Sequence, residues 1–241
     1  VTKMLQKLVA ESAPRFLGIA MDSRTPTFRE ALFADYKKNR PPPPEDLRPQ
    51  FAFVREVVEA FGIPALQQDG FEADDVIATA VRRVAPERPV VILASDKDLC
   101  QLVGDRVLLY VPDKDELYGP AEVEAKFGVK PEQIVDLLAL MGDSSDNIPG
   151  VPRVGQKTAA ELIQQFGSLD EALARAAEVK KPSIQKALQE YAEQARLSRQ
   201  LVTLHTHVDL PFSVADLGPA QPDEEALRAL FHELEFGSLV A

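Results

Sequence analysis

The stretch "EADDVIATAVRRVAPERPVVILASDKDLCQLV", residues 72–103, decides the expected fold. Residues 72–86 have helical spacing of apolar side chains, residues 88–96 form an apolar run that ends in Asp96, and residues 97–103 are typical of a short helix. A buried apolar strand between helices is typical of a sheet that is built from βαβ crossovers. The stretch therefore predicts an α/β fold with a mostly parallel central sheet.

The same alternation extends toward the N-terminus and a little beyond residue 103. Strands are predicted at 15–22, 63–68 and 107–112, and helices at 1–12 and 48–62. The segment "NRPPPPEDLRP", residues 39–49, is too rich in proline for regular structure and predicts an exposed, semi-rigid loop. We expect these elements to form an α/β core over residues 1–119.

After residue 120 the pattern changes to one helix after another. Helices are predicted at 121–128, 132–142, 157–167, 168–178, 183–204 and 223–236. Several of these segments end in glycine, which commonly terminates a helix. Residues 120–241 are therefore expected to form a helical part that follows the core.

Composition excludes several classes of protein. The chain has 241 residues, 45% of them hydrophobic, and one cysteine, which cannot build a disulfide scaffold. No apolar run is long enough to span a membrane, and no secretory leader is evident, so a cytoplasmic protein is expected. The net charge of -11, from 27 basic and 38 acidic residues, argues against a uniformly basic surface.

Carboxylates follow the predicted strands at the points where these strands end. Because the carboxyl ends of parallel strands share one edge of a sheet, side chains from three segments are expected to converge there. These candidate ligands are Asp22, Glu72, Asp74, Asp75, Asp96 and Asp98, and Asp143 and Asp146 repeat the three-residue spacing of Glu72 and Asp75. Crowded carboxylates repel one another unless cations hold them, and oxygen ligands favour Mg²⁺ or Mn²⁺ over zinc.

Each acidic motif also has a purely structural explanation. "EADD" favours the helix dipole at a helix N-terminus, "SDKD" can cap the helix that follows it, and "GDSSDN" is an ordinary polar turn. The coincidence at three predicted strand ends favours a metal site. Two divalent ions about 4 Å apart are a common device for hydrolysing phosphodiester bonds.

Two basic segments accompany the carboxylates. Arg24, Arg29, Lys37, Lys38 and Arg40 alternate with aromatic residues, which is typical either of a nucleic-acid contact or of a solvated helix face. "PGVPRVGQKTAAELI", residues 149–163, combines turn glycines with a helix N-terminus that can bind an anion, with Lys157 beside it. The alternative for this hairpin is a plain loop between helices.

With these motifs in order, the chain resembles the 5′ nuclease (5′-3′ exonuclease) domains of bacterial DNA polymerase I, in the flap endonuclease family. The resemblance rests on residues 21–47, 70–80, 94–103 and 140–163, and "ELEFGSL", residues 233–239, is similar to the join to the next polymerase domain. It implies a PIN-like 5′ nuclease fold with an arch or clamp at about 24–50. It also implies a helix-hairpin-helix element at about 131–166 that grips duplex DNA.

The resemblance also implies roles for individual residues. Asp22, Glu72 and Asp75 would serve mainly a first metal ion, Asp98, Asp143 and Asp146 a second, and Asp74 and Asp96 would support them. Catalytic basic residues of the arch fall on Arg29, Lys37 and Arg40. Contacts to DNA are expected from Arg24, Lys38, Gly150, Arg153, Gly155, Lys157 and Thr158. The family's hairpin carbonyls also hold a monovalent cation, commonly K⁺.

Two departures from the family pattern accompany these expectations. The family begins with a strand that carries a further aspartate ligand, and the sequence is expected to lack that strand, because Val1 already falls in the following helix. In the hairpin, Arg153 and Gln156 replace residues that are usually glycine and proline or glutamate. A residue other than glycine is costly at this turn if its φ is positive.

These expectations favour a divalent-metal-dependent 5′-3′ exonuclease or flap endonuclease in replication and repair. Its partners would be DNA with a 5′ flap, nick or 5′ end and RNA primer–DNA hybrids, with polymerase domains following in the parent chain. We expect a monomer in the bacterial cytoplasm, associated with the nucleoid. The alternatives are a catalytically impaired module that binds DNA junctions and, more distantly, a PIN-like ribonuclease.

Overall fold

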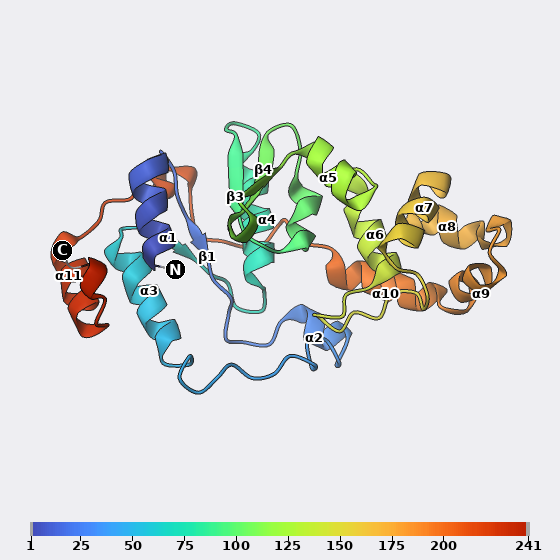
Figure 1. The fold of residues 1–241 in the computed structure, drawn as a ribbon, viewed down its shortest axis with the longest axis horizontal. Helices are drawn as coiled ribbons and strands as arrows, with labels where there is room; N and C mark the ends of the chain where they lie inside the picture. Colours follow the sequence, from blue (N-terminus) through green and yellow to red (C-terminus); the bar gives the residue numbers. More distant parts are fainter. Residues whose placement is uncertain (1, 240–241) are drawn as a thin grey trace. The chain divides into compact units, whose positions relative to one another are not determined.

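The computed structural model describes residues 2–239 (Figure 1). The chain divides into two compact units. The first unit comprises Val1–Thr25, Pro42–Val76 and Asp209–Ala241, and the second comprises Pro26–Pro41 and Ile77–Val208. Each unit has a hydrophobic core of its own and is described by itself.

The first unit is built around a small helical core. It contains α1 (Thr2–Lys7), β1 (Ile19–Ala20), α3 (Gln50–Ala60), β2 (Ala65–Leu66) and α11 (Glu224–Glu233). Strands β1 and β2 pair in parallel, with Ile19 opposite Ala65. Leu5 of α1, Val58 of α3 and Phe231 of α11 meet in the core, which holds the three helices together.

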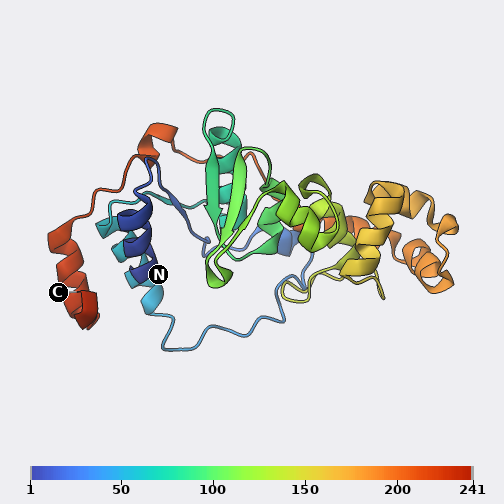
Figure 2. The ribbon, with the colours of Figure 1, turned by 45° about the horizontal axis from the view of Figure 1, so that its top comes forward.

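The second unit contains a three-stranded sheet in the order β3-β4-β5 (Figure 2). Strands β3 (Val90–Leu93) and β4 (Val107–Val111) run parallel, and β5 (Glu116–Tyr118) pairs antiparallel to β4. Alternate residues of β4 are buried, which is the pattern of a strand with one face on the core. Helix α4 (Ala73–Val84) crosses the division of the chain, because the longer segment of the second unit begins at Ile77.

Helices make up the rest of the second unit. They are α2 (Phe28–Leu32), α5 (Pro120–Phe127), α6 (Ile134–Met141), α7 (Gln156–Phe166), α8 (Leu169–Ala174), α9 (Pro182–Glu190) and α10 (Ala192–Val202). Helix α6 is the centre of the bundle, because Leu137, Leu138 and Leu140 are fully buried. As predicted, α5, α6 and α7 each end at a glycine with positive φ, at Gly128, Gly142 and Gly167.

Most of the expected elements are confirmed, and the main differences concern the strands and the longest predicted helix. The strands form two separate sheets, because β1 hydrogen-bonds to β2 and to no other strand of residues 2–239. The single helix expected at 183–204 is two helices, since the backbone of Tyr191 leaves the helical region with φ -110 and ψ 24. Strand β5 was not expected, and a turn that ends at Asp115, with φ 53, reverses the chain to form it.

The N-terminal helix and the proline-rich loop agree with their predictions. Helix α1 continues into a π-helical turn at Leu8–Ser12, while residue 1 of the predicted helix lies outside the described residues. Residues 39–49 contain no helix or strand, and α3 begins at Gln50. The expected division at 119/120 stays a prediction.

Within residues 2–239, no helix is both long enough and apolar enough to cross a membrane.

Candidate functional site

The first acidic group, defined as Asp22, Glu72, Asp74 and Asp75, lies in the first unit at the start of α4. The Asp22 carboxylate accepts a hydrogen bond of 2.8 Å from the backbone nitrogen of Ala73, the first residue of this helix. The Asp75 carboxylate accepts one of 3.2 Å from the Glu72 nitrogen. The loop after β1 is thereby joined to the helix N-terminus, where carboxylates are favourable to the helix dipole.

Burial differs sharply within this group. Asp75 is fully buried and Glu72 nearly so, whereas Asp22 is exposed and Asp74 is half-buried. Two further hydrogen bonds connect the loops around Asp22. The side-chain amide of Gln67 donates to the Asp22 carbonyl, and the backbone nitrogen of Gly70 donates to Thr25 Oγ1. The structure thus brings Asp22, Glu72 and Asp75 to one end of α4, as the sequence predicted for these three.

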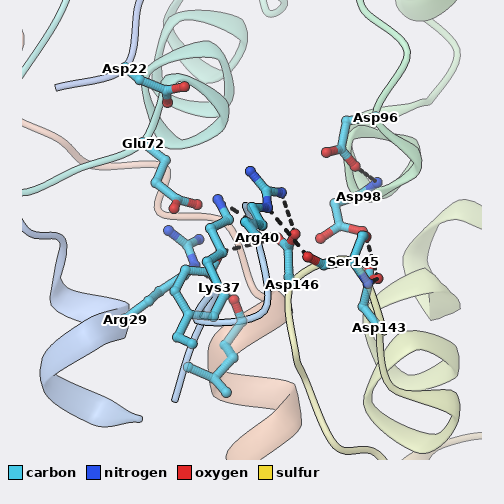
Figure 3. Close-up of polar contacts among 12 residues, drawn as sticks. Asp22, Arg29, Lys37, Arg40, Glu72, Asp96, Asp98, Asp143, Ser145 and Asp146 are labelled. Carbon is cyan, nitrogen blue, oxygen red and sulfur yellow. Dashed lines mark hydrogen bonds and ion pairs between the residues drawn. The ribbon is translucent and has the colours of Figure 1, made fainter. Parts of the chain in front are cut away.

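The second acidic group, defined as Asp96, Asp98, Asp143 and Asp146, lies in the second unit (Figure 3). Asp96 follows β3 and caps the 3-10 helix Lys97–Leu102, because its carboxylate accepts from the Asp98 nitrogen at 2.9 Å. Asp143 and Asp146 come from the loop after α6. The predicted cap at Asp96 is therefore present. The predicted convergence of carboxylates from all three strand ends at one sheet edge stays a prediction, because β1 and β3 belong to separate sheets.

Asp98 is the most perturbed carboxylate of the group. Burial, and then the charge of Asp96, raises the pKa of Asp98 to about 7, against an ordinary value of 3.8. Its Oδ1 atom is buried and has no hydrogen-bond partner among the described residues. A buried carboxylate oxygen without a donor is costly unless a cation satisfies it, so the donor set suits a hard cation.

Lys97 stands beside these carboxylates. Its ammonium forms a short ion pair with Asp143 and lies 3.7 Å from Asp98 Oδ1. Burial opposes the charge of Lys97, but the hydrogen bond to Asp143 and the charges of Asp98, Asp143 and Asp96 outweigh it, so the Lys97 pKa is raised. For Asp143, the bonds from Lys97 and Ser145 outweigh burial and lower the pKa.

The metal-site loop, defined as residues 142–150, carries Asp143 and Asp146 in a closed conformation. Asp143 and Ile148 exchange two backbone hydrogen bonds, of 2.9 and 2.7 Å, across its neck. Ser145 then donates to Asp143 Oδ1 from both its nitrogen, at 2.7 Å, and its hydroxyl, at 2.5 Å. Asp143 is therefore held in place by the turn that contains it.

The arch segment, defined as residues 35–40, is joined to the metal-site loop by hydrogen bonds and ion pairs within the second unit. The Lys37 nitrogen donates to the Asp146 carbonyl at 2.9 Å, and Lys37 adopts a left-handed φ of 55. The Asp146 carboxylate forms a short ion pair with Arg40, lies 3.7 Å from the Lys37 ammonium, and accepts from the Tyr36 hydroxyl at 3.3 Å. Two predicted catalytic residues are thus brought to a predicted metal ligand.

Arg29 occupies a different environment from the other predicted arch residues. It is 1% exposed, and its guanidinium donates to the carbonyls of Leu201 and Thr203 at 2.8 and 3.2 Å. Its guanidinium carbon also lies 4.5 Å from the centre of the Phe28 ring. Arg29 is therefore buried and bonded to backbone carbonyls, and its predicted contact with a phosphate stays a prediction.

The predicted DNA contacts outside this cluster also differ in exposure. Gly150 is buried and its nitrogen donates to Ser198, so it shapes the turn. Arg153 is exposed with φ 69, which confirms that this non-glycine residue adopts positive φ. Gly155 caps the exposed N-terminus of α7, with Lys157 exposed and Thr158 half-buried behind it. Arg24 is exposed in the first unit, and Lys38 pairs with Asp35 at 2.7 Å.

No three His, Cys, Asp or Glu side chains of residues 2–239 converge closely enough to hold a metal ion. In the second group, basic side chains contact the carboxylates instead, at Asp143 and at Asp146. Each acidic group therefore lies within one unit without a preformed metal site in the described residues, and the role of these carboxylates as metal ligands stays a prediction.

Several polar residues of the site were not predicted from the sequence. Tyr36 contacts Asp146, Asn39 donates to the Ser144 carbonyl at 2.5 Å, and Lys97 contacts Asp143. For Lys97 a signal was available, because it lies between two aspartates in "SDKD". For Tyr36 and Asn39 there was none, since their partners lie more than 100 positions away.

Two family descriptions together match residues 1–225. Residues 1–128 match the 5'-3' exonuclease, N-terminal resolvase-like domain, and residues 129–225 match the 5'-3' exonuclease, C-terminal SAM fold. A 5'-3' exonuclease of Aquifex aeolicus is 38% identical over 99% of this chain and 81% of its own length.

Other curated relatives are longer proteins. DNA polymerase I of Rhizobium leguminosarum is 41% identical over 98% of the chain, which covers 24% of that protein. DNA polymerase I of Bacillus caldotenax is 39% identical over 99% of the chain, which covers 28% of that protein. The chain thus spans about a quarter of the length of these polymerases.

Solved structures share the fold at low identity. The T5 5'-exonuclease with bound zinc superposes with a TM-score of 0.76 at 23% identity, covering 97% of this chain and 88% of the other. A T5 flap endonuclease variant, in a pseudo-enzyme-product complex with DNA and metal ions, gives 0.75 at 24% identity, covering 98% and 89%. These likenesses establish the mixed α/β core with its helical C-terminal part.

Proposed function

Because the chain belongs to the 5'-3' exonuclease family, we propose that it is a divalent-metal-dependent nuclease that hydrolyses phosphodiester bonds at 5′ ends and 5′ flaps of DNA. The observation that carries the proposal is the second acidic group, where a buried Asp98 oxygen lacks a hydrogen-bond donor beside three further aspartates. This donor set fits hard divalent cations, and the relatives and structural neighbours that act on DNA support the same chemistry.

We propose Mg²⁺ or Mn²⁺ as the cations, two per molecule. Asp22, Glu72 and Asp75, supported by Asp74, would hold one, and Asp98, Asp143 and Asp146, supported by Asp96, would hold the other. When bound, such ions activate water and neutralise charge on the phosphodiester. Carboxylate oxygens from two loops and two helix starts would provide the ligands, and the reciprocal bonds of Asp143 and Ile148 would hold one of these loops in shape.

Basic side chains would bind the nucleic acid. Lys37 and Arg40 would contact the phosphate near the carboxylates, where each now pairs with Asp146. Arg29, which is buried and bonded to the carbonyls of Leu201 and Thr203, would act beside them as the third catalytic basic residue. Arg24 and Lys38 would contact the 5′ strand. The exposed N-terminus of α7, with Gly155, Lys157 and Thr158, offers backbone N–H groups to the duplex, next to Gly150 and Arg153.

Further proposals concern the hairpin cation and the cellular setting. We propose K⁺ at the carbonyls of the hairpin, which is tested by comparing duplex affinity in K⁺ and in Na⁺. We also propose RNA primer–DNA hybrids as substrates, a monomeric state and a site of action in the bacterial cytoplasm at the nucleoid. The polymerase relatives support a parent protein with polymerase domains after this chain.

A flap-cleavage assay tests the proposal. A 5′-labelled flap substrate is incubated with Mg²⁺ and the chain, with Asp98→Asn, with Asp143→Asn, or with Asp105→Asn, an exposed carboxylate outside both groups, as the control. We expect cleavage at the flap junction that is lost by at least a hundredfold in the first two variants and retained in the third.

The other outcomes of this assay separate the alternatives. Junction binding that needs no metal and gives no cleavage would favour a binding module. Cutting of single-stranded RNA without a junction would favour a PIN-like ribonuclease.

A further inference from the structure

Lys97 lies among the carboxylates of the second acidic group. It is the first residue of the 3-10 helix Lys97–Leu102, between the cap Asp96 and the buried Asp98. Its side chain is 33% exposed, and its ammonium lies against Asp143 and 3.7 Å from Asp98 Oδ1. The positive charge therefore lies between two carboxylates that belong to separate segments of the second acidic group.

The ammonium satisfies these two carboxylates unequally. Asp143 receives the ion pair from Lys97 and two further hydrogen bonds from Ser145. Asp98 Oδ1 receives no hydrogen bond within residues 2–239, and 3.7 Å is too long for one. A single ammonium therefore leaves one buried oxygen without a hydrogen bond, whereas carboxylate oxygens from Asp98 and Asp143 would suit a hard divalent cation.

We propose that the Lys97 ammonium occupies the cation position between Asp98 and Asp143 when no divalent ion is bound, and that it must be displaced for the ion to bind. This inference rests on the proposed function, because it concerns the ion that the nuclease would use. Lys97 is thereby a positioning residue that keeps the empty carboxylates from repelling one another. It also sets the metal concentration at which the second acidic group fills.

Space for the displaced Lys97 ammonium exists beside the second acidic group. A cavity of about 80 Å³ lies next to Lys97, and its lining includes Ser95, Asp96 and Asp113 together with Lys114 and Lys126. A lysine stem has four flexible bonds, so the ammonium can turn toward Asp96 without movement of the backbone. The charge then stays near a carboxylate while the space between Asp98 and Asp143 is vacated.

Direct titration with Mn²⁺ tests the proposal without any nuclease assay. Free Mn²⁺ is followed by electron paramagnetic resonance for the wild-type chain, Lys97→Met, Lys97→Arg and Lys186→Met, the last being an exposed lysine on α9. The Mn²⁺ binding that is lost in Asp98→Asn is assigned to the second acidic group. Removing the competing charge is expected to tighten that part about tenfold in Lys97→Met, while Lys97→Arg and Lys186→Met stay within about twofold of wild type.

A second measurement uses the wild-type chain and so does not depend on whether a variant folds. The amine of Lys97 is methylated under reducing conditions with and without Mn²⁺, and mass spectrometry gives the extent of modification. Displacement predicts that Mn²⁺ increases the modification of Lys97 severalfold and leaves Lys186 unchanged. An unchanged or lower reactivity of Lys97, or an Mn²⁺ affinity in Lys97→Met equal to or weaker than wild type, would overturn the proposal.

Two results keep this inference separate from the proposed function. If flap cleavage is absent but Lys97→Met still binds Mn²⁺ more tightly, the nuclease proposal fails and the displacement stands. If cleavage is present and Lys97→Met loses only affinity for DNA, with Mn²⁺ binding unchanged, Lys97 contacts phosphate and the displacement is wrong.

Discussion

Gly150 lies so close to Gly142 that a Cβ atom on Gly150 would be 2.3 Å from the Gly142 nitrogen. Both glycines have positive φ, 58 and 71, and they face each other at the two ends of the metal-site loop. The loop that carries Asp143 and Asp146 can therefore close only because two backbone segments meet without side chains between them. The positions of Asp143 and Asp146 therefore depend on glycine at both ends of the loop.

Replacing Gly150 by alanine is expected to destabilise the protein by about 3 kcal/mol, because the new methyl group meets backbone atoms and φ stays positive. Urea unfolding followed by circular dichroism measures the change. Gly104→Ala is the matched control, since nothing lies within 4 Å of a Cβ there and its φ is not positive. A decrease in the free energy of unfolding below about 0.5 kcal/mol in Gly150→Ala would mean that the loop accommodates the methyl group by moving.

The buried Asp98 carboxylate predicts a specific pH dependence in metal-free protein. Its pKa is about 7 in the fold and near 3.8 in the unfolded chain, so between these values only the folded state keeps the proton. Stability from this group is complete below pH 4 and is lost as the pH rises through 7. We expect the free energy of unfolding of wild type, relative to Asp98→Asn, to fall by on the order of 3 kcal/mol between pH 4 and pH 8 in EDTA.

This measurement has a clear negative outcome. Chemical unfolding at a series of pH values gives the difference between wild type and Asp98→Asn directly. A difference that is flat between pH 4 and pH 8, or that rises with pH, would show that Asp98 ionises normally in the fold.

Arg153 combines a backbone cost with a charge, and the two can be separated. Arg153→Gly removes both, whereas Arg153→Ala removes the charge and keeps a Cβ at positive φ. Arg153→Gly is expected to raise the free energy of unfolding by about 0.5–1 kcal/mol, and Arg153→Ala to leave it unchanged. If Arg153 contacts a phosphate, both variants reduce the slope of the logarithm of duplex affinity against the logarithm of salt concentration by about one.

Thermal or urea unfolding and DNA binding at several salt concentrations provide the two readouts. Equal gains in stability from Arg153→Gly and Arg153→Ala would exclude backbone strain as the cause. An unchanged salt slope in both variants would remove Arg153 from the DNA contacts.

The sequence predicted the order of the elements and the acidic positions, because both depend on local pattern. Apolar runs identified the segments of β3 and β4, and aspartates after those runs identified the start of the 3-10 helix at Asp96. Single glycines at 128, 142 and 167 likewise predicted where three helices end. Such features need no information about distant parts of the chain.

The environment of Arg29 could not be predicted in the same way. Its guanidinium bonds to carbonyls at the end of α10, 172 and 174 positions further along the chain. Arginine beside aromatic residues is as typical of a nucleic-acid surface as of a buried, carbonyl-bonded side chain. The division of the strands into two sheets and the pairing of Lys97 with Asp143 depend on tertiary contacts for the same reason.

The Asp146 carboxylate is expected to control the arch segment in the metal-free protein. It pairs with Arg40 and Lys37 and accepts from Tyr36, while its backbone carbonyl holds the Lys37 nitrogen. Asp146→Asn keeps the backbone bond and removes the charge, so the segment should open more often. Because partly exposed ion pairs contribute about 0.5–1 kcal/mol each, tryptic cleavage after Lys37 and Lys38 should accelerate about three- to tenfold.

Cleavage is followed by mass spectrometry in EDTA, with Asp105→Asn as the control that removes an exposed carboxylate elsewhere in the second unit. If the ion pairs hold the segment, high salt should accelerate cleavage of the wild type toward the rate of Asp146→Asn and change the variant little, since salt screens exposed charges. Equal rates in wild type and Asp146→Asn at low salt would contradict the prediction. The segment would then be held by uncharged hydrogen bonds, such as that from the side-chain amide of Asn147 to the Asp35 carbonyl, at 2.6 Å.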